Sequence, residues 1–208
     1  MQNTNPDWAY LERFKKENEL HIKQNFSENN IVFIGDSIIA GWNSHSFFST
    51  NSNFINRGIN GQVTTQILHR FKQDVVSLRP KYVVILVGTN DIAENCGSIS
   101  LEDIQNNFLS MLQIAEENSI KVALCSILPV SEYYWNRKIK PQEKINSLNL
   151  FLASLADNKK VYYIDFHSKM KYDNTINPKY SDDGVHPNSV GYNFMTSILI
   201  NSLPEIFT

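Results

Sequence analysis

YVVILV at residues 82–87, followed by GTND at residues 88–91, is the stretch of this sequence that indicates the fold class. An unbroken apolar run rich in β-branched residues is typical of a strand that is covered on both faces. Such strands occur in the middle of parallel sheets with helices on either side. The sequence therefore predicts an α/β protein, with a polar turn directly after its central strand.

Four further runs rich in β-branched and aromatic residues predict strands at residues 31–34, 54–56, 121–125 and 161–164. Apolar residues at helical spacing predict helices near residues 67–78, 104–115, 145–155 and 187–199. Residues 7–20, with Trp8, Leu11 and Phe14 on one side, predict another helix lying over the sheet. This alternation predicts a parallel α/β sandwich whose ligands sit beyond the carboxyl ends of the strands.

The chain has the length and composition of one globular domain spanning residues 1–208, with residues 1–30 as an N-terminal helical extension packing on the sandwich. It carries 19 Lys and Arg against 21 Asp and Glu, a net charge of −2. This balance, with a pI near 6.2, argues against nucleic acid as the main partner. The apolar run at residues 82–87 is far shorter than the ~18 residues of a membrane span, so none is expected.

The first twenty residues mix polar, acidic and basic side chains and lack the apolar core of a secretory signal. We therefore expect a cytoplasmic protein; the alternative is a secreted or periplasmic one whose signal was removed before residue 1. The only two cysteines, Cys96 and Cys125, match neither a zinc site nor a disulfide framework. Both are expected to be reduced.

Polar turns follow three of the predicted strands and precede the last helix, at residues 35–37, 56–62, 88–91 and 181–187. Taken singly, each is explained by an ordinary turn or a helix cap. Because the carboxyl ends of parallel strands meet at one edge of the sheet, we expect the four turns to converge. Together they contain every part of a serine hydrolase.

Ser37 is the predicted nucleophile, and His186 is the base that a weakly nucleophilic hydroxyl requires. Asp183, three residues before His186 across a tight turn, is placed to orient the imidazole. The backbone N–H groups of Ser37 and Gly61 and the side-chain amide of Asn90 are candidate oxyanion-hole donors. The chain has no G-x-S-x-G elbow, which disfavours the α/β-hydrolase lipases.

These blocks resemble the SGNH hydrolases, also called the GDSL family, whose four letters fall here on Ser37, Gly61, Asn90 and His186. Asp183 occupies the family's D-x-x-H position. The resemblance extends from about residue 31 to residue 203. It implies a three-layer, flavodoxin-like α/β/α sandwich, ester hydrolysis through an acyl-enzyme without metal or organic cofactor, and a monomer or homodimer.

Two details of the motifs refine this resemblance. The run at residues 56–61, followed by Thr64-Thr65-Gln66, is similar to the platelet-activating-factor acetylhydrolase-like branch. The GDSL name implies Leu directly after Ser, whereas this chain has Ile38 and Ile39 there. Members of the family vary at this point. The branch suggests a small-molecule substrate with a short acyl group, such as an O-acetyl ester on a sugar. Lysophospholipid and thioester hydrolysis remain open.

The loop at residues 129–141 follows the fourth strand and is rich in aromatic residues. Amphipathic aromatic rings suit sugar faces and acyl chains alike, and they also serve simply to pack a loop on the protein body. From this loop Tyr134 and Trp135, and from the first turn Trp42, are candidate substrate-binding residues.

Two other classes of function use the same residues. A metal-dependent phosphoesterase would employ Asp36, Asp91, Asp183 and His186, but it would lack a second histidine ligand and leave Ser37 without a role. A non-catalytic carbohydrate-binding module on the same fold is disfavoured by the complete set of catalytic groups. We therefore expect a serine esterase with no metal site.

Overall fold

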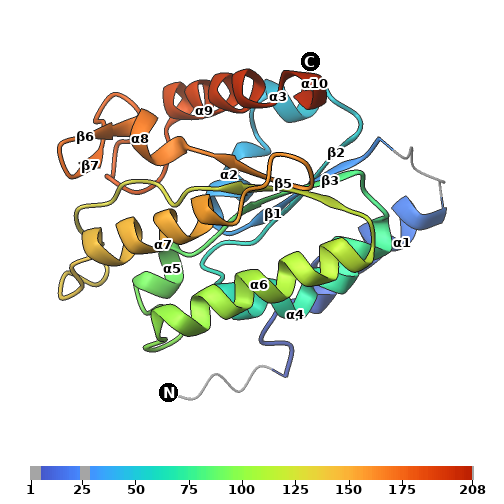
Figure 1. Cartoon of the computed structure of the whole chain (residues 1–208), viewed down its shortest axis with the longest axis horizontal. Helices are drawn as coiled ribbons and strands as arrows, with labels where there is room; N and C mark the ends of the chain where they lie inside the picture. Colours follow the sequence, from blue (N-terminus) through green and yellow to red (C-terminus); the bar gives the residue numbers. More distant parts are fainter. Residues whose placement is uncertain (1–5, 24–28, 208) are drawn as a thin grey trace.

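Five parallel strands form the central sheet in the computed structural model, which describes residues 6–23 and 29–207 (Figure 1). The strands are β1 (Ile31–Gly35), β2 (Phe54–Gly58), β3 (Tyr82–Leu86), β4 (Lys121–Cys125) and β5 (Val161–Ile164). Their order in the sheet is β2-β1-β3-β4-β5, the flavodoxin-like order. All five predicted strands and the predicted sheet class are confirmed.

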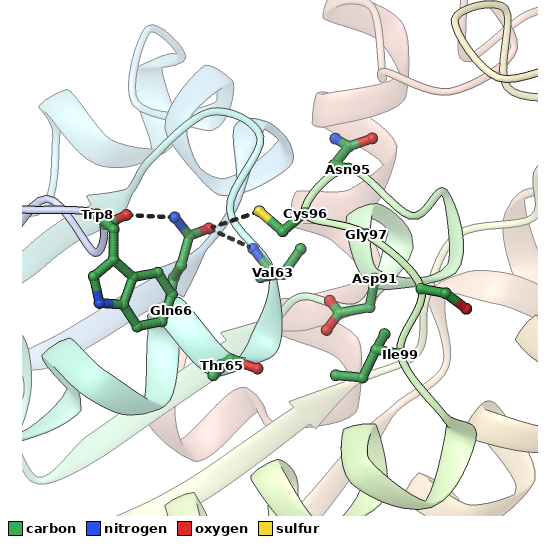
Figure 2. Close-up of a pocket in the computed structure, with 10 residues that line it drawn as sticks. Trp8, Val63, Thr65, Gln66, Asp91, Asn95, Cys96, Gly97 and Ile99 are labelled. Atoms are coloured by element: carbon green, nitrogen blue, oxygen red, sulfur yellow. Dashed lines mark hydrogen bonds between the residues drawn. The ribbon is translucent and has the colours of Figure 1, made fainter. Parts of the chain in front are cut away.

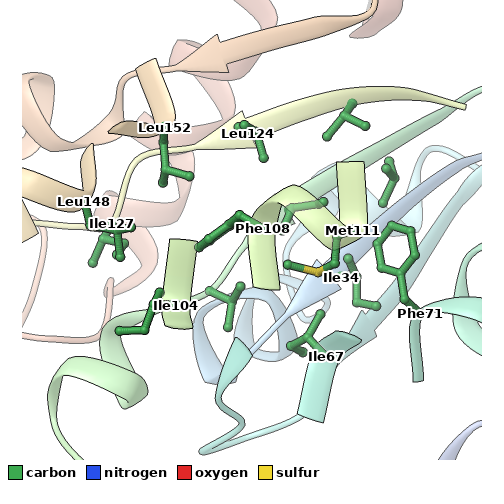
Figure 3. Packing of buried hydrophobic residues seen from close by; sticks show 14 of the residues in the cluster. Ile34, Ile67, Phe71, Ile104, Phe108, Met111, Leu124, Ile127, Leu148 and Leu152 are labelled. Carbon is green, nitrogen blue, oxygen red and sulfur yellow. The ribbon is translucent and has the colours of Figure 1, made fainter. Parts of the chain in front are cut away.

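Helices cover both faces of the sheet and complete the expected three layers (Figure 1). One face carries α4 (Thr64–Asp74), α6 (Leu101–Glu117) and α7 (Gln142–Ser154), whose apolar stripes meet the sheet as shown in Figure 3. The other face carries α2 (Ser37–Trp42), α8 (Phe166–Met170) and α9 (Ser189–Ser202). Shorter elements are α3 (Ser46–Ser49), α5 (Thr89–Ile92), α10 (Pro204–Phe207), the 3-10 turn η2 (Val76–Leu78) and the hairpin β6 (Lys171–Tyr172) with β7 (Thr175–Ile176).

The central strand β3 shows why the fold needs a continuous apolar run. Val83 and Ile85 pack into the core beneath α4, α6 and α7, while Val84 and Leu86 pack into the core beneath α2 and α9. All are buried, because successive side chains of a strand point to opposite faces and both faces are covered. Burying one such side chain stabilises the fold by roughly 1.5–3 kcal/mol. Because the side chains of β3 enter both cores, this strand joins the two cores.

The N-terminal segment differs from its prediction as one helix over the sheet. It forms a 3-10 turn, η1 (Leu11–Arg13), and a separate helix, α1 (Lys15–Lys23), which contacts α4 and η2 and reaches the sheet at Arg57 of β2, whose guanidinium donates to Asn18 Oδ1 at 2.9 Å. The break has a local cause: Tyr10 adopts a left-handed backbone with φ of 60°, and the Asp7 carboxylate accepts from the N–H groups of Leu11 and Glu12. Residues 1–5 and 24–28 of the predicted extension lie outside the described residues.

A buried ion pair fixes the carboxyl ends of β1 and β2. Arg70 and Asp74 of α4 are both fully buried, with Nη1 and Oδ2 2.9 Å apart. Arg70 Nη2 also donates to the carbonyls of Gly35 and Arg57, at 3.1 and 2.7 Å. The guanidinium therefore joins the ends of two strands to the helix layer. The sequence does not reveal this role, because an arginine in an amphipathic helix is expected on the exposed face.

Replacing Arg70 by Ala is expected to lower the free energy of unfolding by about 3–5 kcal/mol, because the change leaves the Asp74 carboxylate buried without its charge partner. Denaturant titration measures this loss. Lys72→Ala, at an exposed position of the same helix, is the matched control and should change stability by less than about 0.5 kcal/mol. Equal small effects for the two variants would contradict this role.

Candidate active site

Ser37 is the first residue of α2 and follows β1 directly, so its side chain lies at the carboxyl edge of the sheet. Asp36 caps the helix, with its Oδ1 accepting from the N–H of Ile38 at 2.9 Å. The helix start packs tightly on the neighbouring strand: a Cβ added at Gly58 would lie 2.2 Å from the backbone nitrogen of Ala40. Glycine at position 58 therefore permits the close approach that places Ser37.

The structure brings Ser37, His186 and Asp183 into one hydrogen-bonded chain across 149 residues of sequence. Ser37 Oγ lies 3.0 Å from His186 Nε2, and His186 Nδ1 lies 2.7 Å from Asp183 Oδ2. The second oxygen of Asp183 accepts from the backbone N–H groups of Val185 and His186, at 2.8 and 2.7 Å. This is the geometry of a nucleophile, a base and a group that orients the base.

The electrostatics of Asp183 favour its ionised form. Partial burial opposes ionisation, but the hydrogen bonds from the His186 ring and from the N–H groups of His186 and Val185 outweigh it and hold the pKa of this carboxyl below its usual value. An ionised carboxylate at Nδ1 fixes the tautomer that leaves Nε2 free to accept the serine proton.

The predicted oxyanion donors come from the turns after β1, β2 and β3. Gly61 is exposed and has φ of +77°, a conformation that favours glycine. Within the described residues, the N–H groups of Ser37 and Gly61 donate to no other protein group. These two predicted oxyanion donors are thus unoccupied by protein acceptors.

Asn90 is more tightly engaged than its sequence motif suggests. Its Nδ2 donates to the carbonyl of Gln62 at 3.1 Å and to Asp36 Oδ2 at 3.3 Å, and its Oδ1 accepts from Asn95 Nδ2 at 2.7 Å. The contact with Asp36 is near the outer limit of a hydrogen bond. Burial raises the pKa of Asp36 to about 7, which reduces the charge that holds this contact.

Asp91, a member of the alternative metal site, has a structural partner instead. Its carboxylate accepts from the N–H and the hydroxyl of Thr64, at 3.0 and 2.5 Å, and so fixes the start of α4. Nowhere in residues 6–23 and 29–207 do three or more His, Cys, Asp or Glu side chains gather closely enough to hold a metal ion. The four residues of the phosphoesterase hypothesis therefore do not form a metal cluster.

The three aromatic residues predicted to bind substrate occupy different places. Trp42 is fully buried, and its indole N–H donates to Thr196 Oγ1 at 3.1 Å, so the expected contact of Trp42 with substrate is wrong. Trp135 lines a cleft next to Gly61, with its indole N–H bonded to Asn95. Tyr134 is exposed and packs edge-on against Trp135.

Ser37 and His186 open onto a cleft of about 860 Å³. Two of its lining residues, Tyr10 and Arg13, come from the N-terminal segment, which sequence reasoning did not connect with the site. Asn60 and Tyr192 line other walls.

No helix in the part of the chain that the structure describes is long and apolar enough to cross a membrane.

Comparison with known proteins agrees with this geometry. Residues 33–194 match the GDSL-like Lipase/Acylhydrolase family, and the chain belongs to this family. It is 39% identical to a Bacteroides fragilis protein assigned to the acylhydrolases, with a TM-score of 0.89 over 97% of this chain and 99% of that one. The chain is therefore a hydrolase of carboxylic esters, as its sequence predicts.

Two further similarities are more distant. The chain is 25% identical to the platelet-activating factor acetylhydrolase IB subunit alpha1 of Bos taurus, over 87% of this chain and 78% of that protein. An acetyl xylan esterase structure shares the fold, with a TM-score of 0.70 and 21% identity over 84% of this chain and 99% of the other. The expected resemblance to acetylhydrolase-like relatives is confirmed.

Asp183→Asn is expected to lower kcat by about 10⁴-fold, because the amide favours the wrong histidine tautomer, as in trypsin-like triads. Steady-state kinetics with a short-chain ester measures the loss. Asp182→Asn is the matched control, since it changes the same charge one residue away, outside the D-x-x-H spacing, and should retain most of the activity. If Asp182→Asn were the more damaging variant, the orienting carboxylate would be misassigned.

Proposed function

We propose that this protein hydrolyses short-chain carboxylic esters through an acyl-enzyme, with O-acetyl groups on carbohydrates as its substrate class. The observation that carries the proposal is the chain from Ser37 through His186 to Asp183, opening onto a cleft. The similarity to an acetylhydrolase and the shared fold of an acetyl xylan esterase support the acetyl group and the sugar.

In the proposed first half-reaction, Ser37 Oγ attacks the carbonyl carbon of the ester while His186 Nε2 accepts its proton. The Asp183 carboxylate stabilises the resulting imidazolium. Collapse of the tetrahedral intermediate breaks the ester C–O bond, and His186 returns the proton to the leaving alcohol oxygen. An acetyl group then remains on Ser37.

In the second half-reaction, a water molecule takes the place of the alcohol. His186 Nε2 accepts a proton from this water as its oxygen attacks the acyl carbon. The carboxylic acid leaves, the proton returns to Ser37, and the enzyme is restored. No redox or metal chemistry is needed to balance either step.

The developing oxyanion is proposed to bind the N–H groups of Ser37 and Gly61 and the amide of Asn90. The Asn90 amide reaches it by exchanging the 3.3 Å contact with Asp36 for the stronger charge of the oxyanion, while the bond to the Gln62 carbonyl keeps the amide in place. One preorganised donor of this kind is worth about 2.7–4 kcal/mol of barrier in serine hydrolases.

A short acyl group is favoured by the walls beside Ser37. A Cβ added at Gly41 would lie 2.4 Å from the hydroxyl of Tyr192, and this hydroxyl is fixed by donation to the Ile38 carbonyl at 2.9 Å. Tyr192 therefore forms a rigid wall of the cleft, and we propose that this wall limits the length of the acyl group.

A series of p-nitrophenyl esters from acetate to palmitate tests the proposal. We expect kcat/KM to be highest for acetate or propionate and to fall at least about tenfold by octanoate, a loss of about 1.4 kcal/mol of transition-state stabilisation. Activity should survive EDTA, and Ser37→Ala should remove it. A maximum at long acyl chains would indicate a lysophospholipase or long-chain thioesterase, and loss of activity in EDTA would favour the metal-dependent alternative.

A further inference from the structure

Three glutamine side chains hold the N-terminal segment Trp8–Arg13 against the body by its backbone. Gln62 Nε2 donates to the carbonyl of Ala9 at 3.0 Å, and Gln66 Nε2 donates to that of Trp8 at 2.6 Å (Figure 2). Gln73 Nε2 donates to the carbonyl of Leu11 at 2.5 Å. These bonds to main-chain oxygens fix the backbone of the segment, and the Trp8 ring adds a contact with the ring of His69, with the two centroids 5.6 Å apart.

The side chains of this segment divide into two sets. Ala9 and, just beyond the segment, Phe14 point inward and are buried, with the Phe14 ring 4.7 Å from the Arg57 guanidinium carbon. Trp8, Tyr10 and Arg13 keep substantial exposed surface. Singly exposed rings are ordinary on protein surfaces, so the clefts that these side chains line, and not their exposure, carry the inference.

These exposed residues line three neighbouring clefts, the first of which contains the catalytic serine. The cleft of Ser37 and a second one of about 560 Å³ share Tyr10 and Asn60. The second cleft, which also contains Trp135, shares Asn95 with a third of about 730 Å³ that is lined by Trp8 (Figure 2). The N-terminal segment thus forms one side of a groove leading away from the catalytic chain.

Tyr10 stands at the junction of the first two clefts in a strained conformation. Its φ of 60° and ψ of 44° are left-handed, which a bulky L-residue adopts at a cost of about 1–2 kcal/mol. The Asp7 carboxylate holds the turn that follows, accepting from the N–H groups of Leu11 and Glu12, while the Tyr10 side chain makes no capping bond of its own. Strain of this kind persists where the surroundings hold it, and it gathers at ligand-binding sites.

We propose that the segment Trp8–Arg13 forms the leaving-group side of an extended carbohydrate-binding groove, in which the Tyr10 ring stacks on the sugar next to the scissile ester. Trp135 and Trp8 offer further ring faces along the groove, and Asn60 and Asn95 offer amide donors and acceptors between them. Alternating ring faces and amides match the apolar faces and hydroxyl edges of sugars better than an acyl chain. This inference rests on the proposed function, and it adds residues that precede the part of the chain matched to the family.

Hydrolysis of three acetyl esters by the full chain tests the groove: ethyl acetate, monoacetylated xylose and monoacetylated xylotetraose. We expect wild-type kcat/KM to be about tenfold higher for the tetraose than for xylose. Tyr10→Gly should reduce kcat/KM for the tetraose by about threefold to tenfold, the range for losing one aromatic contact, and leave ethyl acetate, whose small leaving group offers no ring or sugar face to Tyr10, within about twofold. Tyr10→Gly removes the ring and also relieves the backbone strain, so unfolding should not account for the loss.

Two further variants sharpen the test. Tyr10→Phe keeps the ring and should retain the preference for the tetraose. Tyr172→Ala removes an exposed aromatic residue of β6, outside the three clefts, and should leave all three substrates unchanged.

Equal kcat/KM for acetylated xylose and acetylated xylotetraose in the wild type would overturn the groove while leaving the proposed function standing. An equal loss on ethyl acetate in Tyr10→Gly would also overturn it, because the role of Tyr10 would then be structural. Cleavage of ethyl acetate without cleavage of either acetylated sugar would instead refute the proposed carbohydrate substrate class, and the groove with it.

Discussion

The buried guanidinium of Arg70 connects the segments that carry the active site. It binds the carbonyls of Gly35, two residues before the nucleophile, and of Arg57 at the end of β2, and it donates to the side chain of Gln62 at 2.6 Å. Gln62 in turn accepts from the Asn90 amide and donates to the Ala9 carbonyl. The charge of Arg70, neutralised by Asp74, therefore fixes the ends of β1 and β2, the turn after β2 that contains Gln62, and the N-terminal segment. A desolvated guanidinium stays in the core only when its donors are satisfied, and so these segments are held in one arrangement.

Much of the fold could be predicted from local patterns. The unbroken apolar run at residues 82–87 correctly predicts the central strand β3, and the alternation of strands and helices correctly predicts the observed layers. The hydrogen-bonded chain was predictable because Asp183 and His186 are close in sequence and because strand ends of a parallel sheet converge. Both inferences rest on short-range spacing and one general rule of topology.

The parts that could not be predicted depend on long-range packing. Trp42 occurs in an amphipathic stretch near the nucleophile, but whether its ring faces the cleft or the core is decided by α9, which is more than a hundred residues away and supplies Thr196. Tyr10 lies within the region predicted as a helix, and only the bonds of Gln62, Gln66 and the Asp7 carboxylate reveal the turn that brings it to the catalytic cleft. Arg70 has the spacing of an ordinary helix residue, since nothing local distinguishes a buried arginine from an exposed one.

The central claim is that Ser37 is the nucleophile of an acyl-enzyme reaction, activated by His186 at 3.0 Å. Covalent labelling with a fluorophosphonate, followed by mass mapping of the peptides, tests it most directly, because such reagents react with activated serines and form a stable adduct. The account predicts one adduct per chain, located on Ser37, with loss of esterase activity in proportion to labelling. An active enzyme that forms no adduct, or complete inactivation with the adduct on another residue and Ser37 unmodified, would contradict it.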